Sequence, residues 1–171
     1  MSDSDWKADV ARVGGRRAML REQSLWAIRV YRFGRSIDRR APGPVRATLL
    51  KFYWLSFRFV ETLTGISLPK DAVFGPGIRI WHFGGIFVHP DTRVGMGCTL
   101  RQGVTLGNRE PAGPCPILGN NVELGAYAQV LGGVSIGDNC RIGAMAVVLH
   151  DVPDGASAVG NPARIVWPTA S

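Results

Sequence analysis

The stretch "LGNNVELGAYAQVLGGVSIGDNCRIGAMAVV", residues 118–148, carries an aliphatic side chain at every sixth position. Helices repeat every 3.6 residues and plain strands every 2, so neither period sustains a strict interval of six. The interval continues upstream, with one gap of twelve. The aliphatic residues are Val88, Val94, Leu100, Leu106, Leu118, Leu124, Val130, Ile136, Ile142 and Val148. We therefore expect short strands joined by tight corners and coiled around one axis.

Two further positions recur with these aliphatic residues. Four residues later comes a small or β-branched side chain that we also expect to point inward: Cys98, Val104, Val122, Ala128, Val134, Cys140 and Ala146. Glycine follows directly at Gly95, Gly107, Gly119, Gly125, Gly137 and Gly143. At these glycines we expect the unusual corner conformation that glycine adopts most readily.

The repeat lapses once, at "GNREPAGPCPI", residues 107–117. The segment is rich in proline and has no aliphatic register, so it predicts a loop that projects from the coil. Projecting loops on rigid scaffolds often carry function. A tolerated surface insertion is the alternative, and the sequence leaves both open.

The segment before the repeats, 1–64, has a different composition. Helical spacing predicts helices over 24–37 and 45–64, with Gly65 ending the second. Residues 1–60 hold 13 Lys and Arg against 5 Asp and Glu. Basic and aromatic residues at helical spacing suit an anionic membrane surface. A helical layer that caps a trimer, with a solvated basic face, is the alternative; no nucleic-acid motif accompanies the charge, so no nucleic-acid partner is expected.

Four segments carry a resemblance to a known family: "IRIWHFGGIFV" (78–88), "RQGVTLG" (101–107), residues 116–153 and "AVGNPARIV" (158–166). Together they resemble hexapeptide-repeat acyltransferases, within them serine O-acetyltransferases and the related sugar O-acetyltransferases of polysaccharide biosynthesis. The resemblance implies a mainly β fold, a left-handed parallel β-helix over residues 65–171 with a C-terminal tail, preceded by an α-helical region over residues 1–64. It also implies a homotrimer that uses acetyl-CoA as co-substrate.

His82 is the candidate catalytic residue. In the family, the histidine of a "DH-x-x-G-I-V-V" motif is the general base, and "WHFGGIFV" places His82 there, six residues before Val88 and so in register with the repeat. Imidazole titrates near neutral pH, so it suits taking a proton from an acceptor hydroxyl. Without the motif, a structural role would be the better interpretation of a single histidine.

Departures from the serine acetyltransferase pattern bear on the acceptor. The aspartate before the base is Trp81 here, and the "RHP" of the active-site loop aligns with Pro114, Cys115 and Pro116. Those charged groups hold the ammonium and carboxylate of serine, and charges without partners are costly to bury. We therefore expect a sugar hydroxyl, in surface polysaccharide biosynthesis, as the acceptor, with serine as the first alternative. A non-catalytic scaffold with a basic partner-binding region is the second.

Three residues are possible orienting or substrate-binding groups. A tryptophan beside the base offers a flat face for a sugar ring, although Trp81 packing between coils or subunits is equally consistent. The family's orienting aspartate, fifteen residues before the base, aligns with Ser67. Cys115 is expected to line the pocket at most, because transfer in this family is direct.

The coenzyme site is expected along a ladder of small residues, since Asn108, Ala126 and Ala144 follow one another at equal intervals of three hexads. One coil of this fold contains three hexads, so the three residues would stack. The resemblance adds a C-terminal turn where an arginine meets a phosphate. The candidate coenzyme residues are Asn108, Gly125, Ala126, Gly143, Ala144, Gly160 and Arg164.

The remaining expectations concern metals and location. His82, His89 and His150 fall at different phases of the repeat and match no ligand spacing, so no metal is expected. Three widely spaced cysteines fit a reducing compartment. The polar start of the sequence does not resemble a signal peptide. We expect a cytoplasmic protein, with peripheral attachment to the inner face of the membrane left open.

Overall fold

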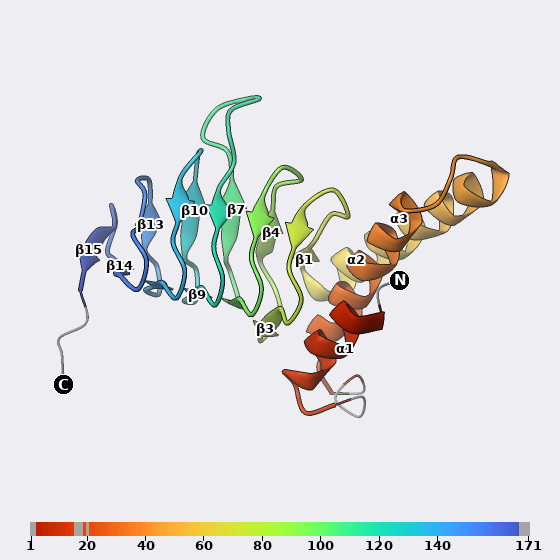
Figure 1. Cartoon of the computed structure of the whole chain (residues 1–171), viewed down its shortest axis with the longest axis horizontal. Coiled ribbons are helices and arrows are strands. Elements are labelled where there is room, and N and C mark those ends of the chain that lie inside the picture. The colour runs from red at the N-terminus through yellow and green to blue at the C-terminus, as the bar shows by residue number, and fades with distance from the viewer. Residues whose placement is uncertain (1–2, 16–18, 20, 168–171) are drawn as a thin grey trace.

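The structure is a computed structural model that describes residues 3–15, 19 and 21–167. Helices come first, and every strand follows them in the chain (Figure 1). The helices are α1 (Asp3–Ala11), α2 (Ser24–Asp38) and α3 (Pro44–Thr64). Gly65 ends α3 in the left-handed conformation, with its N–H donating to the carbonyl of Glu61, as the sequence predicts. The first strand begins at the next residue.

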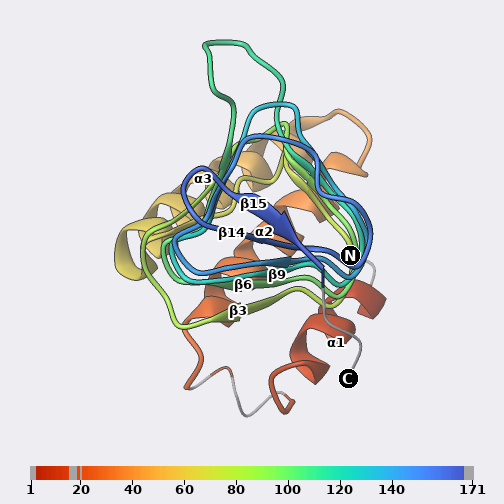
Figure 2. The same cartoon turned by 90° about the vertical axis from the view of Figure 1, so that its left-hand side faces the viewer.

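Three sheets form the sides of a parallel β-helix, as expected for the left-handed form. Sheet A contains β1 (Ile66–Ser67), β4 (Ile86–Val88), β7 (Thr105–Gly107), β10 (Gln129–Leu131) and β13 (Val147–Val148). Sheet B contains β2 (Val73–Phe74), β5 (Arg93–Val94), β8 (Ile117–Leu118) and β11 (Ser135–Ile136). Sheet C contains β3 (Arg79–Trp81), β6 (Thr99–Arg101), β9 (Glu123–Leu124), β12 (Arg141–Ile142), β14 (Ser157–Val159) and the antiparallel β15 (Arg164–Val166). Seen along the axis in Figure 2, successive coils overlie one another.

The inward positions are those that the hexapeptide spacing predicts. All ten aliphatic residues and all seven of their small partners are buried, and they form one continuous core. Residues between them, such as Glu123 and Arg141, are exposed. Because each coil repeats the same inward positions, the core continues without interruption from the first coil to the last.

The six corner glycines do not have the left-handed conformation that was expected from the sequence. None of the six predicted glycines has a positive φ; those angles fall two residues later, at Tyr127 (60°) and Met145 (60°) among others. Close approach between coils explains the glycines instead, because a Cβ on Gly125 would lie 2.5 Å from the backbone nitrogen of Ala144. At Gly107 a Cβ would meet nothing within 4 Å, so crowding does not account for that residue.

The projecting loop, residues 108–116, enlarges one coil. Phe87 pairs with Thr105, three hexads further along the chain, whereas Thr105 pairs with Gln129, four hexads further along. The additional hexad lies between β7 and β8, and the loop stands out from the β-helix in both views (Figures 1 and 2). The predicted projection is therefore confirmed, and its coil no longer follows the interval of three hexads.

The helices cover the first coil and leave one apolar surface exposed. Side chains of α1 and α2, including Trp6, Leu25 and Ile28, join the core of the β-helix. The outer side of α3 carries a row of exposed apolar residues: Val45, Phe52, Leu55, Phe59 and Leu63. Within residues 3–15, 19 and 21–167, none of the helices combines the length and apolarity needed to cross a bilayer.

Candidate active site

One edge of the β-helix gathers most of the candidate residues. This C–A edge is the series of corners where the chain passes from sheet C to sheet A. Strand register stacks its positions in the order His82, Gln102, Ala126, Ala144 and Gly160. Hydrogen bonds between the corners follow the same order, since Tyr127 N–H donates to Gln102 and Met145 N–H to Ala126.

His82 lies at one end of this edge, in an enlarged corner. Val88 follows Ile80 by eight positions, whereas Leu106 follows Leu100 by six positions in the next coil. The expectation that His82 is in simple register with Val88 is therefore wrong, because two residues are inserted after it. His82 has a φ of 63°, which is uncommon outside glycine. Its side chain is exposed and makes no hydrogen bond to any described residue, so it is accessible to an acceptor.

Ser67 lies in β1, the strand next to β4. It is half-buried and pairs with Phe87 in sheet A. Within the described residues, no hydrogen bond joins Ser67 to His82. The orienting role of Ser67 therefore stays a prediction, without a hydrogen bond to support it.

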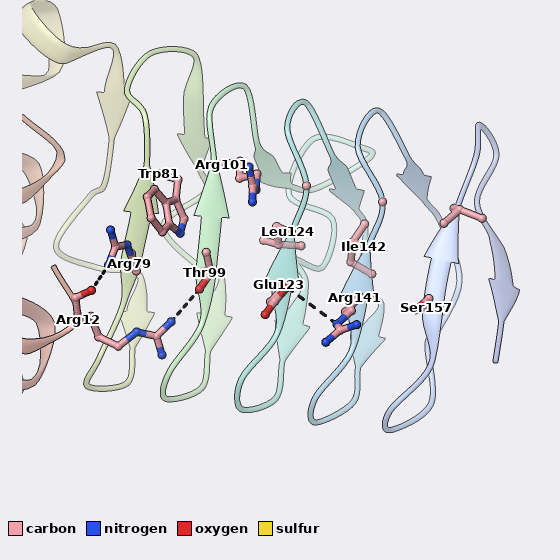
Figure 3. A pocket seen from close by; sticks show the side chains of 13 residues that line it. Arg12, Arg79, Trp81, Thr99, Arg101, Glu123, Leu124, Arg141, Ile142 and Ser157 are labelled. Atoms are coloured by element: carbon pink, nitrogen blue, oxygen red, sulfur yellow. Dashed lines mark hydrogen bonds and ion pairs between the residues drawn. The ribbon is translucent and has the colours of Figure 1, made fainter. Parts of the chain in front are cut away.

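Trp81 lies beside the base and at the end of a groove. The groove has a volume of about 480 Å³ and runs over the outer face of sheet C. Trp81 is 40% exposed, and the guanidinium carbon of Arg79 lies 3.6 Å from the centre of its ring. Figure 3 shows this pair beside Arg101. Gly125 and Gly143 also line the groove, so it adjoins the C–A edge.

Sequence reasoning missed the arginines of this groove. Arg79, Arg101 and Arg141 each sit next to an inward aliphatic residue, so the repeat predicted them only as outward-facing surface. Their gathering on one sheet follows from the register of the coils. A count of outward charges by sheet, made after the repeat was found, would have detected it.

Cys115 lies at a different edge, between sheets A and B. It is buried, and its Sγ lies 3.0 Å from Nδ1 of His89. Burial raises the pKa of the Cys115 thiol, and the nearby charge of Asp91 raises it further. Both effects favour the protonated thiol, which is consistent with the expectation that it is not a nucleophile. Within one chain Cys115 does not line the groove beside Trp81, because the projecting loop leaves sheet A at its other edge, toward sheet B. The expectation that Cys115 lines a pocket stays a prediction.

The same edge holds a group of possible metal ligands. One ligand atom each from His89, Asp91 and Cys115 lie within 4.8 Å of one another, the sole such group of three or more in the described ranges. These residue types suit zinc with a fourth position open. His89, which matched no ligand spacing in the sequence, belongs to this group, whereas His82 does not.

The coenzyme ladder is corrected at one position. Gln102, rather than Asn108, stacks below Ala126, because the coil with the projecting loop contains a fourth hexad. Asn108 instead begins the loop, where its amide donates to the carbonyl of Glu110. Arg164 pairs with Val159 in the last hairpin and is exposed beside Gly160. The remaining candidate coenzyme residues lie along, or next to, the edge that ends in His82.

Comparison with known proteins identifies one matching family and several similar acetyltransferases. The family described as bacterial transferase hexapeptide (six repeats) matches residues 115–150. A serine acetyltransferase of Helicobacter pylori is 34% identical over 147 residues, covering 83% of this chain and 80% of that protein. An Escherichia coli protein named as the colanic acid biosynthesis acetyltransferase WcaB is 38% identical over 120 residues, covering 70% and 72%. The structure of the soybean serine acetyltransferase apoenzyme superposes with a TM-score of 0.81 at 29% identity, covering 95% and 68%.

The lengths of these relatives differ. Several other serine acetyltransferases match at 36–44% identity, but the aligned part spans only 44–56% of their length. The match is therefore to part of those longer proteins, and what their remaining length contributes does not transfer to this chain.

Proposed function

This chain belongs to the hexapeptide-repeat transferases of the serine acetyltransferase type, and from that premise we propose that it transfers an acetyl group from acetyl-CoA to an acceptor hydroxyl. The observation that carries the proposal is the C–A edge. It aligns an accessible histidine with four smaller positions and ends at Gly160, beside Arg164.

His82 acts as the general base in the proposed reaction. Its imidazole takes the proton of the acceptor hydroxyl while the oxygen attacks the thioester carbonyl of acetyl-CoA. The carbon–sulfur bond breaks, and the coenzyme thiolate leaves and takes up the proton that His82 holds. Because His82 has no side-chain partner among the described residues, its imidazole is free to face the acceptor.

The C–A edge suits the coenzyme in length and shape. Four steps between neighbouring strands separate the levels of His82 and Gly160, which is roughly 19 Å at about 4.8 Å each. An extended pantetheine arm would lie along small residues such as Ala126 and Ala144, where backbone groups are accessible. Arg164 at the far end supplies a cation for a phosphate.

The names of the relatives favour serine as the acceptor. The Helicobacter pylori protein aligns over most of both chains, and several further relatives carry the same name. Serine is therefore at least as well supported as any other acceptor by the comparisons alone.

A sugar acceptor is the second candidate, and a specific observation favours it. The residue beside the base is a partly exposed tryptophan, and the loop residue Cys115 is a buried thiol rather than a charged group. Aromatic faces bind the apolar faces of sugar rings, whereas serine needs charges of both signs. The relationship to WcaB supports the same class.

The decisive experiment is thiol release from acetyl-CoA with serine, nucleotide sugars and glycan fragments as acceptors. Turnover with sugars and not with serine would support the sugar acceptor. Efficient acetylation of serine would contradict our interpretation of Trp81 and Cys115. No thiol release with any acceptor, together with no binding of acetyl-CoA in calorimetry, would reject the proposed acetyl transfer. It would favour a non-catalytic scaffold.

A trimer is part of the proposal. The edge with His82 and the edge with Cys115 lie on opposite sides of sheet A, so the two residues are separated within one chain. Packing of neighbouring β-helices would allow the projecting loop of one chain to approach the C–A edge of the next. Sedimentation at several protein concentrations tests the trimer directly.

A further inference from the structure

We propose that the arginine groove, formed over sheet C by Arg12, Arg79, Arg101 and Arg141, binds a diphosphate that is part of the acceptor. The acceptor would then be a sugar attached to a diphosphate group. This inference rests on the proposed acetyl transfer at His82 and specifies which hydroxyl compounds reach it. Figure 3 shows Arg79, Arg101 and Arg141 on strands of one face, with Arg12 reaching that face from the segment after α1.

The groove has an excess of positive charge. Four guanidinium groups line it against the single carboxylate of Glu123. That carboxylate lies 3.9 Å from Nε of Arg141, at the limit of an ion pair. Arg101 is exposed and has no hydrogen-bond or ion-pair partner among the described residues. A dianionic group would therefore find cations that the protein itself does not neutralise.

Two of the cations are held in place. Arg79 stacks on the Trp81 ring and donates from Nη1 to the carbonyl of Arg12. Its Nε is buried without a partner in the part of the chain that the structure describes. Arg12 is fixed in turn by bonds from its guanidinium to Gly97 O (3.0 Å) and Thr99 Oγ1 (2.9 Å). Preorganised guanidinium groups bind phosphate with less loss of side-chain entropy than free ones.

The position of the groove relates the phosphate to the base. Trp81 directly precedes His82 and pairs with Arg101 on the next strand. Neighbouring strands are about 4.8 Å apart, so one strand spacing separates the aromatic ring from the free cation. A sugar on Trp81 would thus place its diphosphate near Arg101 and a ring hydroxyl toward His82.

Serine does not need such a groove. A zwitterion carries no net charge, whereas the groove offers three cations more than carboxylates. Nucleoside diphosphate sugars and polyprenyl diphosphate sugars share the required chemistry. They differ in what lies beyond the second phosphate, and kinetics can separate them.

The first test is calorimetric titration of the full-length protein with inorganic pyrophosphate at low salt. We expect R101Q to weaken binding about tenfold, since one charge-assisted contact to a phosphate is lost. The matched control is R93Q, an exposed arginine on sheet B, which should bind like the unaltered protein. Absence of pyrophosphate binding, or equal weakening in both variants, would overturn the proposal.

The second test measures acetyl transfer to a nucleoside diphosphate sugar and to a polyprenyl diphosphate sugar in detergent micelles. R101Q should raise the KM for the acceptor about tenfold and leave the KM for acetyl-CoA unchanged, and the acceptor with the lower KM identifies the source. A higher KM for acetyl-CoA instead would mean that the groove holds coenzyme phosphates. If no acceptor is turned over, the proposed function fails, while pyrophosphate binding still decides whether the groove binds anions.

Discussion

The β-helix and the helical region of this chain are held together in different ways. In the β-helix, the same inward positions recur in every coil, so many equivalent contacts share the stabilisation. The helices dock on the first coil through apolar side chains such as Trp6 and Leu25 and through a few buried polar side chains that occur once each. A repeated sequence therefore shows its fold through periodicity, whereas a docked segment depends on single residues that no period reveals.

The contact between Asp9 and Arg32 illustrates the second kind. Nε of Arg32 lies 2.8 Å from Oδ2 of Asp9, and the two side chains are only 6% and 0% exposed. Nη1 of Arg32 donates to the carbonyl of Phe74, and Oδ1 of Asp9 accepts the N–H of Gly77. One pair thus joins α1 and α2 to the first coil.

The largest expected effect is the loss of activity when the proposed base of the β-helix, His82, is replaced. His82→Asn should lower acetyl transfer by about 10²–10⁴-fold, because the general base is lost. Asparagine tolerates a positive φ, and the side chain is exposed, so the melting temperature should not change. Thiol release measures the activity, and His150→Asn, also exposed, is the matched control. Equal activity in the two variants would remove His82 from the reaction.

The next largest effect is the loss of stability when the contact that docks the helices is removed. Asp9→Ala removes the nearest carboxylate from the buried Arg32 and leaves it only the longer ion pair with Asp5 at 3.8 Å, so we expect a loss of about 3–5 kcal/mol in the free energy of unfolding. Denaturant titration measures that loss, and limited proteolysis should cleave first before residue 65. Glu110→Ala, an exposed acid in the projecting loop, should change stability by less than about 0.5 kcal/mol. A similar small change for Asp9→Ala would show that the helices dock without this pair.

A third effect depends on pH. Burial raises the pKa of Tyr53 to about 12, although the Lys70 N–H that donates to its hydroxyl lowers it. Between pH 10 and 12 the unfolded chain therefore ionises this tyrosine first, and stability falls as the pH rises. The loss from this residue is up to about 2–3 kcal/mol.

The test of this pH effect is the slope of stability against pH rather than its level. Tyr53→Phe removes one hydrogen bond, so its stability at pH 8 should fall by about 1 kcal/mol. Above pH 10 its stability should then decline less steeply than that of the unaltered protein. Tyr127→Phe, at an exposed position, should keep the original slope. An unchanged slope in Tyr53→Phe would contradict the role of burial.

The sequence predicted the coils better than the corners. Inward positions such as Leu124 and Ala128 were predictable because burial of the aliphatic side chain of each hexad, and of the small side chain four residues later, follows directly from the period. The stacking of Asn108 was not, because the insertion of one whole hexad keeps the aliphatic spacing at a multiple of six while shifting every corner after it. Periodicity fixes which residues face inward, but not which corners lie above one another.

The candidate site was predictable only in part, for a related reason. His82 could be proposed from its motif, and its edge from the small residues. The arginine groove depends on register between strands of successive coils, which lie far apart in the sequence, and the Cys115–His89 contact depends on the path of the loop. Both are properties of the assembled coils, which local spacing does not determine.

The smallest expected effect is that of Phe59→Ser, which tests whether the exposed face of α3 stays uncovered in solution. Phe57 and Phe59 lie two residues apart on α3, but Phe57 is 8% exposed and Phe59 is 67% exposed. Serine and phenylalanine have similar helix propensities, so the two substitutions differ mainly in burial. Phe57→Ser should cost about 3–5 kcal/mol and Phe59→Ser less than about 0.5 kcal/mol, measured by denaturant unfolding. A loss above about 2 kcal/mol for Phe59→Ser would mean that another surface covers the exposed row of α3 in solution, and its dependence on protein concentration would show whether that surface is a second copy of this chain.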